Sequence, residues 1–188
     1  ADGGLPAEGA SRRRLLASSA GRATRMRVFI RPIGGGRTIA LSDGKDAFEF
    51  QPRWSPDGNQ ILYISPTGVY VASALGGASR QLVSGEVSAA SWAPDGKRVL
   101  VARQEQVSIV APDGTGERQL GRAPDELYSC DWTLRGDRIV CTYGNRPNMT
   151  PGGTFGNIAP SGLILFTAAG GPFTPVAGLR GLNQSPVW

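Results

Sequence analysis

The chain has 188 residues and a formal net charge of +5, and its 27 glycines and 14 prolines favour many turns over long helices. It contains no histidine, which excludes Ser-His-Asp and Cys-His catalysis, histidine metal ligands and imidazole proton shuttles. Its arginines are scattered and not interleaved with aromatic residues, and no apolar run approaches the ~18 residues of a membrane-spanning helix. We therefore expect no nucleic acid, no membrane insertion, no metal and no other cofactor.

In chain order, residues 1–11 are expected to be a poorly ordered segment or the remnant of a preceding strand. Alternating apolar and polar residues then predict strands in successive groups. These strands are 12–19, 25–32 and 37–41; 50–54, 60–65, 68–73 and 79–83; and 88–92, 98–103, 106–111 and 117–120. Helical periodicity does not extend over any useful length, so the chain is predicted to be all-β.

A tryptophan stands before a turn in each later group of strands. Trp54, Trp92 and Trp132 recur about every 40 residues, which is the period of a propeller blade built from four strands. Trp188 follows after a longer interval, which indicates an insertion in the fourth unit. Two of the tryptophans precede Pro-Asp-Gly, in which proline fixes φ and glycine accepts positive φ. The residues assigned to this structural repeat are Trp54, Pro56, Asp57, Gly58, Trp92, Pro94, Asp95, Gly96, Trp132 and Trp188.

These repeated residues have a structural interpretation. One tryptophan per unit, always in the same place, is typical of packing between blades rather than of an aromatic binding platform. The turn explains each aspartate, so no catalytic residue is assigned.

Two cysteines, Cys130 and Cys141, flank one predicted hairpin. They are expected to lie nearly opposite each other on adjacent strands, where a disulfide would have strained geometry. We therefore interpret them as two small buried hydrophobic residues.

The repeat predicts a β-propeller of four-stranded antiparallel blades. It divides the chain into a partial blade at 12–43, blades at 48–84 and 87–121, a blade at 127–178 with an insertion at 144–162, and the first strand of a next or closing blade at 182–188. About four blades are present, and we expect them to belong to a larger ring of about six to eight; the alternative is a four-blade ring that the last strand closes. Because an open arc exposes apolar surface, we also expect self-association through blade edges.

The motifs Trp54-Ser55-Pro56-Asp57-Gly58 and Trp92-Ala93-Pro94-Asp95-Gly96 resemble the WD-like repeats of bacterial TolB-type β-propellers. The corresponding stretch Trp132-Thr133-Leu134-Arg135-Gly136 departs from the motif. Residues 156–176 and 182–188 look like parts of the propeller that follows the kinase domain in some bacterial serine/threonine kinases. The resemblance implies a sensing or interaction module and favours a periplasmic or otherwise extracytoplasmic location.

The insertion at 144–162 is the one predicted connection that is much longer than the repeated blade requires. It falls between the second and third strands of its blade, on the face opposite the Pro-Asp-Gly turns, and that face also carries the blade-to-blade connections. Binding residues concentrate on long loops set on rigid scaffolds. The candidate binding residues are therefore Arg146, Asn148, Met149, Phe155 and Asn157. The alternative is a loop that only covers the central channel or a blade edge.

The functional hypothesis is a non-catalytic module that binds a protein or a small ligand through the insertion face. One alternative is the propeller portion of a larger enzyme, either a kinase sensor region or a gating propeller of the prolyl oligopeptidase or dipeptidyl peptidase type. Another is a small propeller lyase or hydrolase, which the absence of histidine disfavours.

Overall fold

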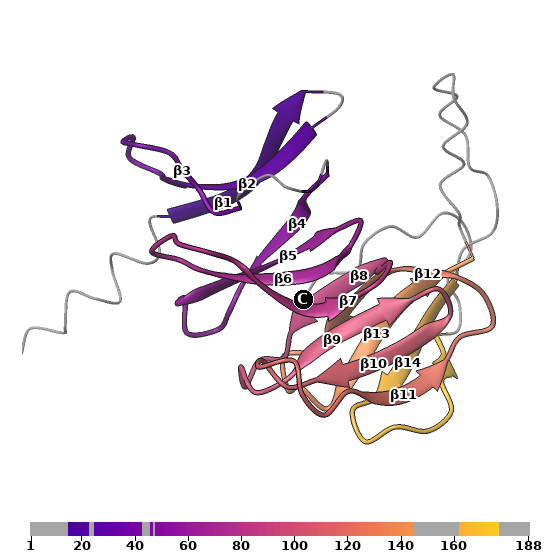
Figure 1. Ribbon diagram of the computed structural model, residues 1–188. Coiled ribbons are helices and arrows are strands. Elements are labelled where there is room, and N and C mark those ends of the chain that lie inside the picture. The colour runs from indigo at the N-terminus through magenta and orange to yellow at the C-terminus, as the bar shows by residue number, and fades with distance from the viewer. Residues whose placement is uncertain (1–14, 23–24, 43–45, 47, 145–161, 177–188) are drawn as a thin grey trace, which may run out of the picture.

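The computed structural model describes residues 15–22, 25–42, 46, 48–144 and 162–176. Within these residues all the regular elements are β-strands, and they form four antiparallel sheets that follow one another along the chain (Figure 1). The all-β prediction is confirmed. This part of the chain contains no helix that is long and apolar enough to cross a membrane.

Each sheet is one group of consecutive strands, paired in chain order. The first sheet contains β1 (Leu15–Arg22), β2 (Arg25–Pro32) and β3 (Ile39–Ala40). The second contains β4 (Phe50–Trp54), β5 (Gln60–Ser65), β6 (Gly68–Ser73) and β7 (Arg80–Ser84). The third contains β8 (Ala89–Trp92), β9 (Val99–Arg103), β10 (Gln106–Val110) and β11 (Arg118–Arg122). The fourth contains β12 (Leu127–Trp132), β13 (Arg138–Tyr143), β14 (Gly162–Thr167) and β15 (Thr174–Pro175).

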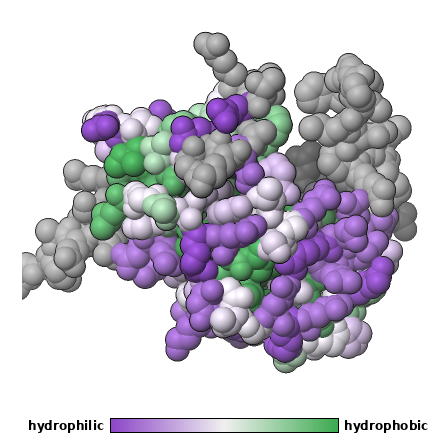
Figure 2. All heavy atoms as spheres, in the orientation of Figure 1, coloured by the Kyte–Doolittle hydropathy of each residue, from purple (hydrophilic) through white to green (hydrophobic). Residues whose placement is uncertain are grey.

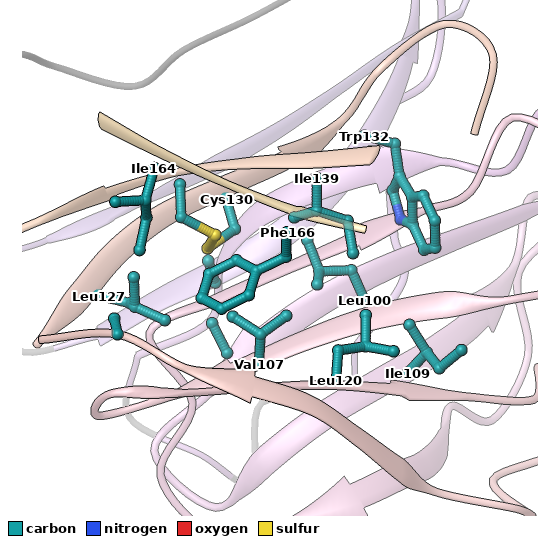
Figure 3. Packing of buried hydrophobic residues seen from close by; sticks show 14 of the residues in the cluster. Leu100, Val107, Ile109, Leu120, Leu127, Cys130, Trp132, Ile139, Ile164 and Phe166 are labelled. Carbon is teal, nitrogen blue, oxygen red and sulfur yellow. A yellow bond between two sulfur atoms is a disulfide. The ribbon is translucent and has the colours of Figure 1, made fainter. Parts of the chain in front are cut away.

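The second strand of each complete sheet is buried on both faces. In β5 all residues after Gln60 are buried, and in β9 only Arg103 is partly exposed. Apolar clusters fill the spaces between the first and second, second and third, and third and fourth sheets. Figure 3 shows the last of these, in which Val107 of the third sheet and Phe166 of the fourth contribute to one core. Because neighbouring sheets cover both faces, these strands read as continuous apolar runs rather than strict alternations.

The turns between first and second strands share one geometry. The backbone N–H of Gly58 donates to the carbonyl of Ser55 over 2.8 Å, and Gly96 repeats this bond with Ala93 over 2.9 Å. Gly136 does the same in the fourth sheet, although its turn lacks the Pro-Asp-Gly sequence. All three glycines have φ near 70°, which side-chain-bearing residues rarely adopt. The glycine at the end of the turn is therefore the element that the fourth repeat keeps.

Two kinds of hydrogen bond join neighbouring sheets. The indole nitrogen of Trp92 donates to the carbonyl of Arg53 over 3.2 Å. From the fourth strand of the third sheet, the guanidinium of Arg118 in β11 donates to the carbonyls of Ala168 and Ala169, each over 3.0 Å. Arg80 in β7 contacts the β10–β11 turn of the third sheet in the same manner. The second sheet is therefore joined to the third, and the third to the fourth, by a tryptophan bond and an arginine contact at separate places.

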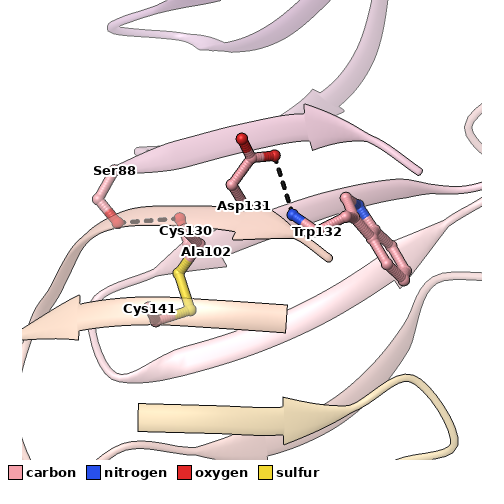
Figure 4. Close-up of a disulfide and its surroundings, with 6 residues drawn as sticks. All are labelled: Ser88, Ala102, Cys130, Asp131, Trp132 and Cys141. Carbon is pink, nitrogen blue, oxygen red and sulfur yellow. Dashed lines mark hydrogen bonds between the residues drawn. A yellow bond between two sulfur atoms is a disulfide. The ribbon is translucent and has the colours of Figure 1, made fainter. Parts of the chain in front are cut away.

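The interpretation of the cysteines as two reduced residues is wrong. Cys130 and Cys141 are direct partners in the β12–β13 register and form a disulfide (Figure 4). Their Cα atoms are 4.1 Å apart, close to the spacing of a non-hydrogen-bonded antiparallel pair. This close approach brings the two sulfur atoms within bonding distance across the hairpin, inside the core between the third and fourth sheets.

Hydrophobic residues gather on the surface of the first sheet. Figure 2 shows them there, whereas much of the surface over the later sheets is hydrophilic. In and beside this sheet, Leu16, Ile33, Ile39 and Phe48 each expose 40% or more of their surface. Single exposed apolar residues are ordinary, but a group of them on one sheet is typical of a contact surface.

Candidate functional site

One side of the sheets carries the links between second and third strands and the connections between sheets. We name this side the connection face; in the second and third sheets it comprises residues 66–67, 85–88, 104–105 and 123–126. Backbone hydrogen bonds tie its parts together. The N–H of Gly85 donates to Thr67 over 3.0 Å, and the N–H groups of Ala123 and Leu127 donate to the β9–β10 turn over 2.7 Å. The connections are thus held against the hairpin turns that they pass.

The link between β13 and β14 reaches the same face. Tyr143 pairs with Gly162, so residues 144–161 connect the two strands, whereas two residues suffice between β5 and β6 and between β9 and β10. The N–H of Gly144 donates to the carbonyl of Glu126 over 3.0 Å, which fixes the start of this link to the connection face. The predicted binding residues Arg146, Asn148, Met149, Phe155 and Asn157 lie outside the described residues.

A cavity of about 350 Å³ opens on the connection face. Three segments build it: the connection into β8, the β9–β10 hairpin and the connection into β12. The lining residues are Glu86, Val87, Ser88, Arg103, Gln104, Gln106 and Glu126. Since the carbonyl of Glu126 also holds Gly144, the cavity lies directly beside the start of the long link.

The lining of the cavity contains charged side chains of both signs. Arg103 forms an ion pair with Glu117, which is not part of the lining. Glu86 and Glu126 are the acidic residues of the described lining, and Arg103 is its basic residue.

The β9–β10 turn that shapes the cavity has an uncommon backbone. Gln104 has a φ of 48°, in the left-handed region that residues other than glycine, asparagine and aspartate seldom adopt. Its carbonyl accepts the N–H of Leu127 over 2.7 Å, so the next connection holds this conformation in place. Non-glycine residues in this region cluster at functional sites.

The opposite side carries the turns between first and second and between third and fourth strands; we name it the turn face. Asp113 and Asp137 accept hydrogen bonds within their own turns. The hydroxyl of Thr133 donates to Asp137 over 2.8 Å, and this bond lowers the pKa of Asp137 below its usual value. A bond from the Thr115 hydroxyl lowers the pKa of Asp113 in the same way. Carboxylic acids held in the ionised form do not supply protons, so these positions suit turns rather than acid catalysis.

The repeat residues lie at the contacts between sheets. Trp92 and Trp132 are buried, with 7% and 3% of their surface exposed, whereas Trp54 is half-buried and Trp188 lies outside the described residues. Pro56 and Pro94 are exposed, and each lies within 4 Å of the place that a Cβ atom would take on the turn glycine of the next sheet, Gly96 and Gly136 respectively. The guanidinium of Arg98 lies 4.8 Å from the centre of the Trp132 ring, bonds to Asp95 over 2.8 Å and donates to Gly136 over 3.2 Å.

The cavity was not among the sites expected from the sequence. Its lining comes from three segments that only strand pairing brings together, and no motif marks any of them. The described residues also contain no group of three or more acidic or cysteine side chains placed to hold a metal ion.

No protein-family model matches the sequence, and no curated protein does either. Solved structures do match. A putative TolB from Agrobacterium tumefaciens superposes with a TM-score of 0.71 at 19% identity, over 89% of this chain and 62% of that one. The fold is a TolB-like β-propeller. The propeller predicted from the repeat is therefore confirmed.

Two further solved structures also match the fold of this chain. The nidogen/laminin complex matches with a TM-score of 0.60 at 10% identity, over 83% of this chain and 72% of that one. The tricorn protease matches with a TM-score of 0.57 at 12% identity, over 88% of this chain and 17% of that one. The chain thus spans less than two thirds of the TolB chain and a small part of the protease. Since one fold occurs both in a protein complex and in an enzyme, the fold alone does not assign a function.

Proposed function

We propose that this chain is a non-catalytic interaction or ligand-sensing module that binds a protein or a small ligand through its connection face. The observation that carries the proposal is the link between Tyr143 and Gly162, where residues 144–161 replace the two-residue turns of the preceding sheets. A cavity opens beside the start of that link. Long loops and concave pockets on rigid scaffolds are the common places for binding.

The packing of the sheets that carry this face favours it as a binding surface. Three apolar cores lie between these sheets, and the tryptophan and arginine hydrogen bonds join neighbouring sheets. The candidate residues Arg146, Asn148, Met149, Phe155 and Asn157 would add charge, amide groups and apolar surface to the partner contact. The matched nidogen/laminin complex is an assembly of proteins, which supports a protein as the partner.

We place the protein outside the cytoplasm. Disulfides persist in oxidising compartments and are rare in the cytosol, and the Cys130–Cys141 bond supports such a location. The exposed apolar residues of the first sheet support a second contact surface there, through which the chain associates with further propeller strands or with itself.

A second candidate function is the propeller portion of a larger enzyme. The match to 17% of the tricorn protease chain favours it, because in that protein a comparable stretch belongs to an enzyme. Reading the complete gene decides between the two: a kinase or hydrolase domain in the same reading frame supports the enzyme, and a frame that encodes propeller repeats alone supports the interaction module.

The proposed function is tested by exchanging the long link. Residues 145–161 are replaced by Pro-Thr-Gly, the sequence that follows Ser65 between β5 and β6. Both forms are immobilised beside a control, Leu75→Ser, which alters a side chain with 93% of its surface exposed on the turn face. Proteins captured from an extract of the source cells are quantified for all three, and circular dichroism checks the folding of each.

A partner retained by the native chain and by the control, but lost by the exchanged form, supports the connection face as the binding surface. Equal capture by all three forms contradicts it. An exchanged form without β-structure shows that the link covers the blades and contributes to folding instead.

A further inference from the structure

The first sheet has three strands, whereas each of the other sheets has four. In the described part of the chain, β1 pairs with β2 along one edge and with no strand along the other. In the complete sheets the second strand has the first strand on that edge, and the first strand ends in Trp54, Trp92 or Trp132. The first sheet therefore has an open place for such a strand, beside β1.

The residue of β1 that would border the missing tryptophan can be identified. β1 and β5 have matching registers, because the strands that follow them place a core valine and a core leucine at the same spacing; the two pairs are Val28–Leu41 and Val69–Leu82. By this match Leu16 takes the place of Ile61, which pairs with Trp54. Ile61 is fully buried, and so are its counterparts in the third and fourth sheets, Val99 and Ile139. Leu16 exposes 41% of its surface.

Backbone groups of β1 point toward the open place. The carbonyl of Val28 accepts the N–H of Leu41 over 2.9 Å and therefore points away from β1. Val28 and Ser19 are thus a non-hydrogen-bonded pair, and both residues of such a pair direct their N–H and C=O groups outward. The same holds for Ala17, two residues earlier in the strand. An unpaired edge of this kind is a template for a further strand.

The indole of Trp54 lacks the acceptor that the other tryptophans have. The indole N–H groups of Trp92 and Trp132 each donate to a backbone carbonyl in the first strand of the preceding sheet. None of the described residues accepts the indole N–H of the half-buried Trp54, whose preceding sheet has no such strand. A strand beside β1 would supply this acceptor together with partners for the backbone groups of the edge.

We propose that residues 182–188 of a second copy of this chain complete the first sheet by pairing with β1. These residues end in Pro186-Val187-Trp188, which repeats the pattern of Pro52-Arg53-Trp54 in the first strand of the second sheet. The inference gives the chemistry of the second contact surface proposed above and is independent of the connection face.

The register of the other sheets fixes the contacts of the added strand. Trp188 lies opposite Leu16, as the other tryptophans lie opposite their apolar partners. Val187 then lies opposite Ala17 and bonds to its edge N–H and C=O groups. The carbonyl of Val187 also accepts the indole N–H of Trp54, which continues the series of tryptophan bonds between sheets.

The length of the connection favours a second copy over the same copy. Four residues lead from β7 to β8 and from β11 to β12 (85–88 and 123–126), and five residues (177–181) stand between Val176 and Leu182. A connection of this length reaches the place next to the fourth sheet, as the earlier ones reach the next sheet. The first sheet lies at the other end of the series of sheets (Figure 1).

The faces that meet in this arrangement are both apolar. Ile164 and Phe166 belong to the core with the third sheet, so the alternate residues Leu163 and Leu165 point away from it and are only partly buried. Phe29 likewise points away from the core that the first and second sheets share, and it is partly exposed. The first sheet of the second copy thus covers the fourth sheet as neighbouring sheets cover each other.

The test separates the donor of the strand from its acceptor. A chain without residues 182–188 keeps the acceptor edge, whereas Ala17→Pro keeps the donor strand but removes an edge N–H that β2 does not use. Sedimentation velocity should show that the native chain self-associates and that each variant alone is a monomer. An equal mixture of the two variants should form a one-to-one complex, because one donor and one acceptor remain. Leu75→Ser, on the turn face, is the control and should associate like the native chain.

A peptide reports on Trp54 directly. The acetylated amide of residues 182–188 is titrated into the truncated, isotope-labelled chain, and the indole N–H signal of Trp54, assigned with Trp54→Phe, is followed by NMR. The signal should shift and its exchange with solvent should slow, because the indole gains an acceptor. N-methylation of Val187 in the peptide removes a strand hydrogen bond without changing the side chain and should weaken binding about tenfold.

Several outcomes would overturn the inference. A monomeric native chain whose Trp54 indole is protected, unlike that of the truncated chain, would show that residues 182–188 pair within their own copy. A monomer with an unprotected indole, variants that do not combine, or a peptide that leaves the Trp54 signal unchanged would exclude the pairing with β1. If Ala17→Pro does not fold, the truncated chain and the N-methylated peptide make the same comparison. The exchange of residues 145–161 alters neither β1 nor residues 182–188, so the proposed function stands or fails separately.

Discussion

The indole N–H of Trp132 donates a hydrogen bond to the backbone carbonyl of Ser91, with a nitrogen-to-oxygen distance of 3.4 Å. Ser91 precedes Trp92, whose own indole donates to Arg53, the residue before Trp54. Trp92 and Trp132 therefore both bond to the backbone next to the tryptophan of the preceding sheet. The repeat in the sequence is the repeat of a contact between blades.

Removal of Trp92 should weaken the contact between its own sheet and the preceding one, because its side chain belongs to the core between those two sheets and its indole bonds to Arg53. Trp92→Ala should lower the free energy of unfolding by about 3–5 kcal/mol, as other large aromatic truncations in cores do. That is a large part of the ~5–15 kcal/mol that most domains possess. Urea unfolding, followed by the circular dichroism of the backbone so that the signal does not depend on the tryptophan, measures this change in stability. Leu75→Ala, at a position 93% exposed, is the control and should shift the midpoint little; an unchanged midpoint for Trp92→Ala would contradict a packing role.

Two glycines separate the cost of backbone conformation from the cost of crowding. Gly68 has a φ of 148°, and a Cβ atom there would lie 2.1 Å from the carbonyl oxygen of Val83. Gly77 has a φ of 111° but no atom within 4 Å of the same position. Gly77→Ala should therefore cost about 1–2 kcal/mol for conformation alone, and Gly68→Ala should cost clearly more because a backbone atom cannot move aside. Thermal melting of both variants gives the comparison, and equal melting temperatures would refute the crowding at Gly68.

The buried carboxyl of Glu49 should make stability fall as the pH rises. Burial is the main cause that raises its pKa above the ordinary value of 4.5, although hydrogen bonds from the Ser42 hydroxyl and the Val28 backbone and the charge of Arg27 act in the opposite direction. A raised pKa in the folded state means that stability is fully present below pH 4.5 and is lost as the pH rises through the folded-state pKa.

Glu49→Gln removes this titration and is the matched test. Urea midpoints measured from pH 4 to pH 8 should decline less steeply for the variant than for the native chain. The lowered pKa values of Asp95, Asp113 and Asp137 act at lower pH, and they cancel in the difference between the two proteins. A difference between variant and native chain that stays constant across this range would show that folding does not raise the pKa of Glu49.

The disulfide between Cys130 and Cys141 should be present in protein prepared without reductant. Alkylation under denaturing, non-reducing conditions should leave both thiols unmodified in a mass spectrum, and prior reduction should add two labels. Because the bond closes a short loop of sequence separation 11, its loss in the double variant Cys130→Ala and Cys141→Ala should cost about 2–3 kcal/mol. Labelling of both cysteines before reduction would restore their interpretation as reduced core residues.

The strands could be predicted from the sequence where recognisable turn sequences stand at both of their ends. Pro-Asp-Gly and Pro-Thr-Gly set both ends of β5, and its predicted range, 60–65, agrees with the observed strand. The disulfide was not predictable, because the general objection to cross-strand bonds ignored how closely directly opposed residues can approach. The cavity was missed for another reason: Glu86, Arg103 and Glu126 come from separate segments, and only the assembled blades bring them together.

The tryptophan and arginine hydrogen bonds between neighbouring blades have a consequence for recognition. The tryptophan bonds and the arginine bonds of Arg80 and Arg118 lie at different points along each contact, so one blade cannot rotate on the next without breaking both. Backbone hydrogen bonds from Ser88 to Ala102 and from Leu127 to Gln104 likewise join the segments that shape the cavity. If a partner binds there as proposed, the segments of the cavity are already ordered. Less of the interaction energy is then lost to ordering the binding site. Mutations that loosen a blade contact far from the connection face should weaken binding there without removing a single contact to the partner.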